Sequence, residues 1–426
     1  MNLIIKNGRL IDPATNMDCV CDIVIKNGKI KEIGSYLDGA GIDESIDATG
    51  LVVCPGFIDM HVHLREPGQE HKETIETGSR AAVRGGFTSI ACMPNTSPVN
   101  DSVEITQRII NRAKEVGLLN ICPIPSITRN LDSNELSDLE ALVEVGAVGF
   151  SDDGKCVMSE NLFREALELA KKLHVPIIEH PEDHSISLDG HMHEGELSRK
   201  LGIKGIPAEA EDEIIARDIR LQEEVDSFLH LTHISTACAV RMIAEAKKRN
   251  PHITSDVTPH HLLLNESYLE GKDPVYKMKP PLRTEADRLA LIEGIKDGTI
   301  DCIATDHAPH SREEKAKRFE EAPFGIIGME TSFPVIYDRF VRPGFINMKQ
   351  LIRLFSTNPA KILNLHDRGM VKPGVPADLT ILDLEKPFKI KAEDFQSRSV
   401  NCPFIGWEGK GVVEYTIVSG RVVFRS

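Results

Sequence analysis

The sequence predicts an α/β fold, a TIM-like (β/α)8 barrel joined to a small β-sandwich domain that is built from both ends of the chain. Eight short apolar segments alternate with amphipathic helical segments through the middle of the chain, and both ends are rich in β-branched residues around turn signals. We expect the barrel over residues 55–366 and a composite β domain from residues 1–54 and 367–426. A length of 426 residues accommodates both, and an open doubly wound sheet is the alternative architecture.

The two ends of the chain predict β-hairpins. Asn-Gly between β-branched runs is a strong hairpin signal, and it occurs at Asn7–Gly8 and Asn27–Gly28. Residues 376–384 and 413–424 have the same β character, with a turn at Ser419–Gly420. We expect these strands to assemble into one small domain.

The middle of the chain supplies eight candidate strands separated by helices such as residues 73–85 and 159–173. Strands that alternate with helices indicate a parallel sheet, and eight is the number that closes into a barrel. The candidate strands span residues 56–63, 88–95, 120–126, 147–153, 175–181, 228–235, 253–260 and 301–307.

Composition excludes several classes of protein. Hydrophobic residues make up 41% of the chain and charged residues 27%, which excludes a disordered chain. A net charge of −15 without a basic run argues against binding to nucleic acid or to an anionic membrane surface. We also expect no targeting signal and no membrane span, because the apolar runs are too short. Nine scattered cysteines fit free thiols in the cytoplasm better than a disulfide framework.

Histidines and aspartates lie where five of the candidate strands end. Residues i and i+2 of a strand face the same side, so His61 and His63 can both point into the barrel. Active sites of such barrels lie at the carboxyl ends of the strands, and imidazoles with carboxylates favour Zn²⁺ or a similar divalent ion. Six ligands are more than one tetrahedral ion can bind, and they suit two ions about 3.5–4 Å apart. The predicted ligands are His61, His63, Asp153, His180, His233 and Asp306.

Six motifs, in order along the chain, resemble the amidohydrolase superfamily and, within it, the type I dihydroorotases. The resemblance implies the reversible cyclisation of N-carbamoyl-L-aspartate to L-dihydroorotate and water, a step of de novo pyrimidine biosynthesis. It also implies a zinc enzyme, with two ions as the expected number, and the same six ligands. The motifs are DMHVHLREPG (59–68), CMPNTSP (92–98), GFSDDG (149–154), EHPED (179–183), LTHIST (231–236) and IATDHAPH (303–310).

The resemblance further assigns roles around the substrate. Asp306 corresponds to the proton carrier, while Arg65, Asn95 and His310 correspond to substrate-binding residues. A guanidinium, an amide and an imidazole suit a carboxylate. Backbone groups near Pro323 and Gly325 are implied against the pyrimidine ring.

One position departs from the family pattern. Lys279 stands near the substrate, where the family often carries Asn, which leaves the fine substrate contacts open.

Alternative functions remain at this point. Another cyclic amidase, such as a hydantoinase or allantoinase, is the second hypothesis, and a metal-free scaffold paralogue is the third. Homo-oligomerisation and association with aspartate transcarbamoylase are expectations from the family alone. The segment Gly149–Cys156 nearly fits a phosphate-binding loop, but Cys156 replaces the required hydroxyl and two acidic side chains would face the phosphate. His260 and His261 are expected to be structural.

Overall fold

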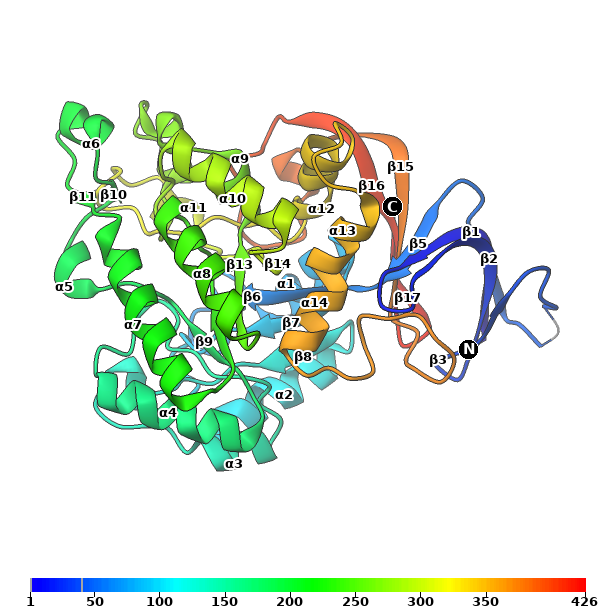
Figure 1. Ribbon diagram of the computed structural model, residues 1–426. Coiled ribbons are helices and arrows are strands. Elements are labelled where there is room, and N and C mark those ends of the chain that lie inside the picture. Colours follow the sequence, from blue (N-terminus) through cyan, green and yellow to red (C-terminus); the bar gives the residue numbers. More distant parts are fainter. Residues whose placement is uncertain (1, 40) are drawn as a thin grey trace.

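The computed structural model describes residues 2–39 and 41–426, which form a barrel and a sheet that packs beside it. Figure 1 shows the helix-covered barrel on the left and the strands from both ends of the chain together on the right. In the described part of the chain, no helix combines the length and the apolar character that crossing a bilayer requires.

Eight strands from the two ends of the chain make one sheet, here called the terminal sheet. Its path runs β17-β16-β15-β5-β1-β2-β3, and β4 also pairs with β1. β5 and β15 pair antiparallel, and this pairing joins the amino-terminal strands to the carboxy-terminal strands. The strands are β1 (Leu3–Asp12), β2 (Met17–Lys26), β3 (Lys29–Gly34), β4 (Glu44–Asp47), β5 (Val52–Pro55), β15 (Leu379–Lys389), β16 (Glu408–Val418) and β17 (Arg421–Arg425).

The hairpin expected at Asn7–Gly8 is wrong. β1 runs straight through these residues and pairs with β2 on both sides of them, with a bulge in the register between Ile5 and Gly8. Asn7 has a φ of 61°, and its N–H donates to Asp22 Oδ1 at 2.9 Å, so the residue outside the ladder still has a hydrogen-bond acceptor. The turns at Asn27–Gly28 and Ser419–Gly420 are confirmed, because each joins two antiparallel strands.

The barrel strands are parallel and fall into two runs. The first run is β6-β7-β8, with β6 (Phe57–Val62), β7 (Phe87–Cys92) and β8 (Asn120–Pro123). The second run is β9-β12-β13-β14, with β9 (Ile177–Glu179), β12 (Leu229–Leu231), β13 (Ile253–Val257) and β14 (Cys302–Ile303). A parallel bridge between Val62 and His307 connects β6 to the chain after β14, which closes the barrel on that side.

The fourth predicted strand, residues 147–153, is reduced to a single bridge between Phe150 and Ile177. Ser151 N–H still donates to Pro125 O at 3.1 Å, and Phe150 N–H donates to Pro176 O at 3.2 Å. Prolines on both neighbouring segments have no N–H to return, so a regular ladder cannot form here. The segment nevertheless occupies the position of the fourth barrel strand, between β8 and β9.

Helices follow the barrel strands and cover them on the outside (Figure 1). The long helices are amphipathic, and the predicted ones begin at capping side chains, Thr74 before α1 and Ser159 before α4. They are α1 (Ile75–Arg84), α2 (Val103–Val116), α3 (Leu139–Glu144), α4 (Glu160–Leu173), α7 (Glu209–Val225), α8 (Ala237–Arg249) and α10 (Glu285–Asp297). The last barrel unit is followed by α12 (Ser332–Ile336), α13 (Met348–Ile352) and α14 (Asn358–Ile362).

Short elements decorate the loops at the carboxyl ends of the strands. They are α5 (His184–Ser187), β10 (Met192–His193), α6 (Glu196–Leu201), β11 (Gly205–Ile206), α9 (Pro259–Leu263) and α11 (Arg312–Lys315). Because β10 pairs with β11, the loop after β9 carries a small sheet of its own.

An aromatic cluster closes the opposite end of the barrel. Phe57 and Phe87 begin β6 and β7, and both are fully buried. The ring centroid of Phe57 lies 6.0 Å from that of Phe87, 5.7 Å from that of Phe333 and 5.3 Å from that of Phe355. Three rings packed around Phe57 bury a large apolar area at the amino ends of the strands.

We predict that Phe57→Ala lowers the free energy of unfolding by about 3–5 kcal/mol, because it removes a buried ring and leaves a cavity. Urea denaturation followed by circular dichroism measures this change. Phe345→Ala is the matched control, since that ring is 53% exposed and its removal is expected to cost about 0.5 kcal/mol or less. Equal losses in the two variants would contradict the role assigned to the cluster.

Candidate metal centre

All six predicted ligands meet at the carboxyl end of the barrel, and all six side chains are buried. Their nitrogen and oxygen atoms fall into three overlapping groups, in each of which the ligand atoms lie within 4.8 Å of one another. The groups are His61, His233 and Asp306; His61, His63 and Asp153; and Asp153, His180 and His233.

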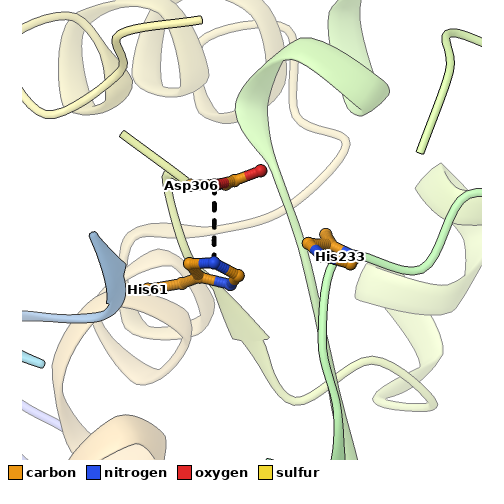
Figure 2. A group of neighbouring side chains, drawn as sticks. All are labelled: His61, His233 and Asp306. Atoms are coloured by element: carbon orange, nitrogen blue, oxygen red, sulfur yellow. Dashed lines mark ion pairs between the residues drawn. The ribbon is translucent and has the colours of Figure 1, made fainter. Parts of the chain in front are cut away.

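The strand β6 positions the first half of the centre. His61 lies in β6 and His63 follows its end, so the two imidazoles share one side of the strand. His61 Nε2 lies 3.1 Å from Asp153 Oδ1 and 3.4 Å from Asp306 Oδ1, and His63 Nε2 lies 3.0 Å from Asp306 Oδ1. Figure 2 shows His61 below Asp306, with His233 approaching from another segment.

Two further imidazoles form the second half. His180 Nδ1 lies 2.8 Å from His233 Nε2, so two ring nitrogens face each other across the centre. Asp153 Oδ1 lies 3.4 Å from His180 Nδ1 and 3.8 Å from His233 Nε2, whereas Asp153 Oδ2 lies 3.4 Å from His63 Nε2. Asp153 Oδ1 is thus close to imidazoles of both halves, and this carboxylate lies between the two halves of the centre.

The charges at the centre depend on one another. Burial favours neutral imidazoles, but the carboxylates of Asp153 and Asp306 raise the pKa of His61 to about 10. His180 likewise has its pKa raised to about 9 against burial, by Asp153 and Glu182. In return, and against their own burial, the imidazoles hold the pKa of Asp153 well below its usual range and also lower that of Asp306. The two carboxylates are ionised and need positive charge beside them.

The residues fit a divalent metal ion. His61 Nε2 points into the centre without a hydrogen-bond partner, although it is completely buried. An orphaned ring nitrogen and opposed imidazoles surrounding two ionised carboxylates are the donor set that such an ion binds.

Residues outside the ligand set orient the imidazoles. His61 Nδ1 is paired with Thr232 Oγ1 at 2.8 Å, and Thr232 Oγ1 donates to Asp256 Oδ2 at 2.9 Å. Asp256 Oδ1 also accepts from the backbone N–H of His233 at 2.7 Å, so this one carboxylate on β13 supports two ligands. Such outer contacts fix the ring orientation of metal-binding histidines.

The other two imidazoles also have outer partners. His63 Nδ1 is paired with Asn95 Oδ1 at 2.8 Å, and His180 Nε2 lies 3.4 Å from Glu182 Oε2. The sequence reasoning missed Glu182, Thr232 and Asp256. Glu182 lies two residues after His180, and Thr232 directly precedes His233. This closeness to predicted ligands is the signal that could have found them.

Three residues of the site have left-handed backbone conformations. The φ angles are 61° for Arg65, 40° for His233 and 45° for Asp306. Non-glycine residues seldom adopt this region, and the cost is accepted where the surroundings hold a side chain in a required direction. Each residue follows a barrel strand at the point where the chain turns away, and all three side chains line the cavity of the site.

A cavity of about 360 Å³ opens on the metal centre. The six predicted substrate-binding residues all line it, together with five of the six ligands; His61 lies deeper. Met278, Phe324 and Ala308 also line the cavity and were not predicted. The predicted lining residues are Arg65, Asn95, Lys279, His310, Pro323 and Gly325.

Arg65 supplies buried positive charge to the cavity. Its Nε donates to Pro309 O at 3.2 Å, and one terminal nitrogen lies 3.4 Å from His310 Nε2. Burial lowers the pKa of Arg65 to about 10, so the guanidinium stays charged at neutral pH. Burial and the neighbouring Arg65 lower the pKa of His310 to about 2, so this imidazole is neutral.

Lys279 reaches the cavity but is already paired. Its Nζ lies 2.7 Å from Glu182 Oε1, and it stands 5.4 Å from the ring centroid of Phe324. The lysine therefore links the outer partner of His180 to the cavity wall.

Two lysines hold the loop that carries Pro323 and Gly325. Lys277 Nζ donates to the carbonyl oxygens of Phe319 and Ala322, both at 2.7 Å. Lys315 Nζ donates to the carbonyl oxygens of Pro323 and Gly325, at 3.1 and 3.0 Å. These bonds fix the main chain of the loop over the cavity.

Neither the segment that resembles a phosphate-binding loop nor His261 forms a site of its own. Asp152 turns away from the centre and accepts hydrogen bonds from Thr128, and the helix α4 begins only at Glu160, so Gly149–Cys156 does not open a helix as a phosphate-binding loop does. His261 is buried, with Nε2 3.0 Å from Pro280 O.

Comparison with known families and proteins adds independent evidence. The Dihydro-orotase-like family matches residues 50–238, and the Amidohydrolase family matches residues 289–424. The chain is 48% identical to a dihydroorotase of Geobacter metallireducens over 425 residues, which cover 100% of both proteins. It is 47% identical to a dihydroorotase of Staphylococcus epidermidis over 422 residues, or 99% of each.

Solved structures share the fold. An L-hydantoinase (dihydropyrimidinase) from Arthrobacter aurescens matches with a TM-score of 0.89 and 26% identity, over 99% of this chain and 96% of that one. A dihydropyrimidinase from Brevibacillus agri matches with a TM-score of 0.85 and 25% identity, over 100% and 95%. The predicted (β/α)8 barrel with a β-sandwich from both termini is thereby confirmed. The chain is 48% identical to a dihydroorotase over its full length and carries a histidine–aspartate centre. It therefore belongs to the dihydroorotase family, whose members are cyclic amide hydrolases of the amidohydrolase superfamily.

Proposed function

We propose that the chain is a type I dihydroorotase, which catalyses the reversible cyclisation of N-carbamoyl-L-aspartate to L-dihydroorotate and water in pyrimidine biosynthesis. The observation that carries the proposal is a single cavity that brings together a metal-binding centre, the carboxylate of Asp306 and the buried cation Arg65. This combination matches an anionic cyclic amide as substrate.

The centre is proposed to hold two zinc ions. His61, His63, Asp153, His180, His233 and Asp306 would hold them. Bound divalent ions lower the pKa of water to near 7 and polarise a carbonyl group. The support for two ions is the number of converging donors and the position of Asp153 between the two halves of the centre.

Asp306 is proposed as the proton carrier. Its carboxylate lines the cavity and is kept ionised by the neighbouring imidazoles, so it can accept a proton. In hydrolysis it takes the proton of the attacking water and delivers it to the departing ring nitrogen. In cyclisation the same carboxylate carries the proton in reverse.

The carboxylate of the substrate is proposed to bind Arg65, Asn95 and His310. Arg65 contributes the charge, because His310 is neutral at physiological pH. The main chain at Pro323 and Gly325 would contact the ring. Lys279 would contact substrate only after loosening its pairing with Glu182.

The remaining proposals concern the setting of the enzyme. Free thiols at all nine cysteines support a cytoplasmic location. Assembly into homo-oligomers or with aspartate transcarbamoylase, and the division into residues 1–54 with 367–426 and residues 55–366, remain proposals that rest on the family resemblance and on the sequence pattern.

Dihydroorotate hydrolysis tests the function directly. We predict that purified, metal-loaded protein hydrolyses dihydroorotate, followed as the loss of ring-amide ultraviolet absorbance, and does not turn over hydantoin or allantoin. Asp306→Asn is predicted to lower kcat by roughly 10²–10⁴-fold, because it removes the proton acceptor. Asp301→Asn is the matched control, since Asp301 lies at the other end of the same strand and pairs with Lys247 at 2.7 Å; its kcat should equal that of the wild type.

Two results would contradict the proposal. Turnover of hydantoin without turnover of dihydroorotate would assign the chain to the other cyclic amidases. Full activity in Asp306→Asn would remove this residue from the reaction.

The role of Arg65 makes a separate prediction. Arg65→Met keeps most of the side-chain length but removes the charge, so KM for dihydroorotate should rise roughly 100-fold, with a smaller change in kcat. Arg312→Met is the matched control, because it removes the same charge from an exposed position in α11. Steady-state kinetics of Arg65→Met and Arg312→Met tests the prediction. Similar rises in KM in the two variants would show that overall charge, not the Arg65 guanidinium, attracts the substrate.

A further inference from the structure

A segment of the carboxy-terminal chain crosses from the terminal sheet to the catalytic cavity. This segment, here called the strap, comprises residues 396–402 and lies between β15 and β16. Ser397 Oγ donates to the buried carboxylate of Glu73, and the Ser399 hydroxyl lies within hydrogen-bond distance of two carbonyl oxygens, 2.8 Å from His310 O and 3.0 Å from Lys72 O. The strap therefore contacts two barrel loops that belong to different strands.

The side chain of Asn401, in the strap, makes three hydrogen bonds to the main chain of the cavity wall. Its Nδ2 donates to Ala308 O and to Gly325 O, both at 3.0 Å, and its Oδ1 accepts from His310 N–H at 3.4 Å. Its own carbonyl accepts from Ile327 N–H at 3.1 Å. The side chain is 4% exposed, so water does not compete for these bonds.

The three main-chain partners of the Asn401 amide all belong to residues that line the cavity. Gly325 has a φ of 148°, and a Cβ at this position would lie 2.6 Å from Ala308 O and 2.7 Å from His310 Cδ2. The main chain of the loop thus packs directly on the imidazole of His310. The Asn401 amide therefore bonds to the main chain of both walls, beside the direct bond from Ala308 N–H to Ile326 O at 2.9 Å.

We propose that Asn401 is a positioning residue for substrate binding, which sets the separation between His310 and the main chain of Gly325. The inference rests on the proposed function, because those two groups are the proposed contacts to the carboxylate and to the ring of the substrate. Asn401 touches neither the metal ligands nor Asp306 through any hydrogen bond of the described chain. Its loss should therefore weaken substrate binding and leave the metal centre intact.

Steady-state kinetics of Asn401→Ala and Asn401→Asp tests this inference. Both variants lose the two N–H donors, and Asn401→Asp keeps the shape of the side chain in case the smaller residue prevents folding. We predict that KM for dihydroorotate rises roughly tenfold while kcat changes by about threefold or less, with wild-type metal content. A residue that served stability alone would lower the amount of active enzyme and leave KM unchanged.

Asn120→Ala is the matched control. Asn120 also joins the barrel to the terminal sheet, through Thr88 O and Asp378 Oδ2, both at 2.9 Å, but it does so at the amino end of β8, away from the cavity. Its KM is predicted to equal that of the wild type. An unchanged KM in both Asn401 variants, or an equal rise in Asn120→Ala, would overturn the inference while wild-type turnover upholds the function. Absence of dihydroorotate turnover in the wild type would overturn the proposed function and this inference with it.

Discussion

The attraction between two buried carboxylates and the imidazoles around them is the interaction on which the site depends. Asp153 and Asp306 are ionised although both side chains are buried, which is costly unless positive charge lies beside them. The four histidines provide nitrogen donors on every side, and the barrel brings them there from strands that lie far apart in the sequence. Three left-handed residues and the carboxylate of Asp256 show how much of the local chain is committed to that arrangement.

The cavity combines two opposite electrostatic environments within one acidic chain. The metal centre is rich in carboxylate, whereas Arg65 places a buried cation in the same cavity. The loop over the cavity owes its position to ammonium groups and to the strap, and so the terminal sheet takes part in shaping the site.

The sequence could predict that the six residues converge, because each lies at or just after the carboxyl end of a predicted barrel segment. His61 and His63 share one side of β6 by the two-residue period of a strand, and the remaining ligands share the carboxyl edge of the barrel. Asn401 could not be predicted in this way, since only the fold brings it to Ala308, 93 residues earlier in the chain. The bulge at Asn7 and the reduced fourth strand were missed because both depend on partners that lie elsewhere in the chain. Asp22 accepts the N–H of Asn7 in place of a local turn, and prolines on the neighbouring segments interrupt the pairing beside Phe150.

The metal content of two neighbouring variants tests the central claim most directly. Asp153→Asn and Asp152→Asn change adjacent carboxylates, but only Asp153 faces the imidazoles, while Asp152 is bound to Thr128. Elemental analysis of the folded, metal-loaded proteins should find wild-type metal content in Asp152→Asn and a clear loss in Asp153→Asn. Full metal content in Asp153→Asn would contradict the account, because Asp153 would then not be a ligand.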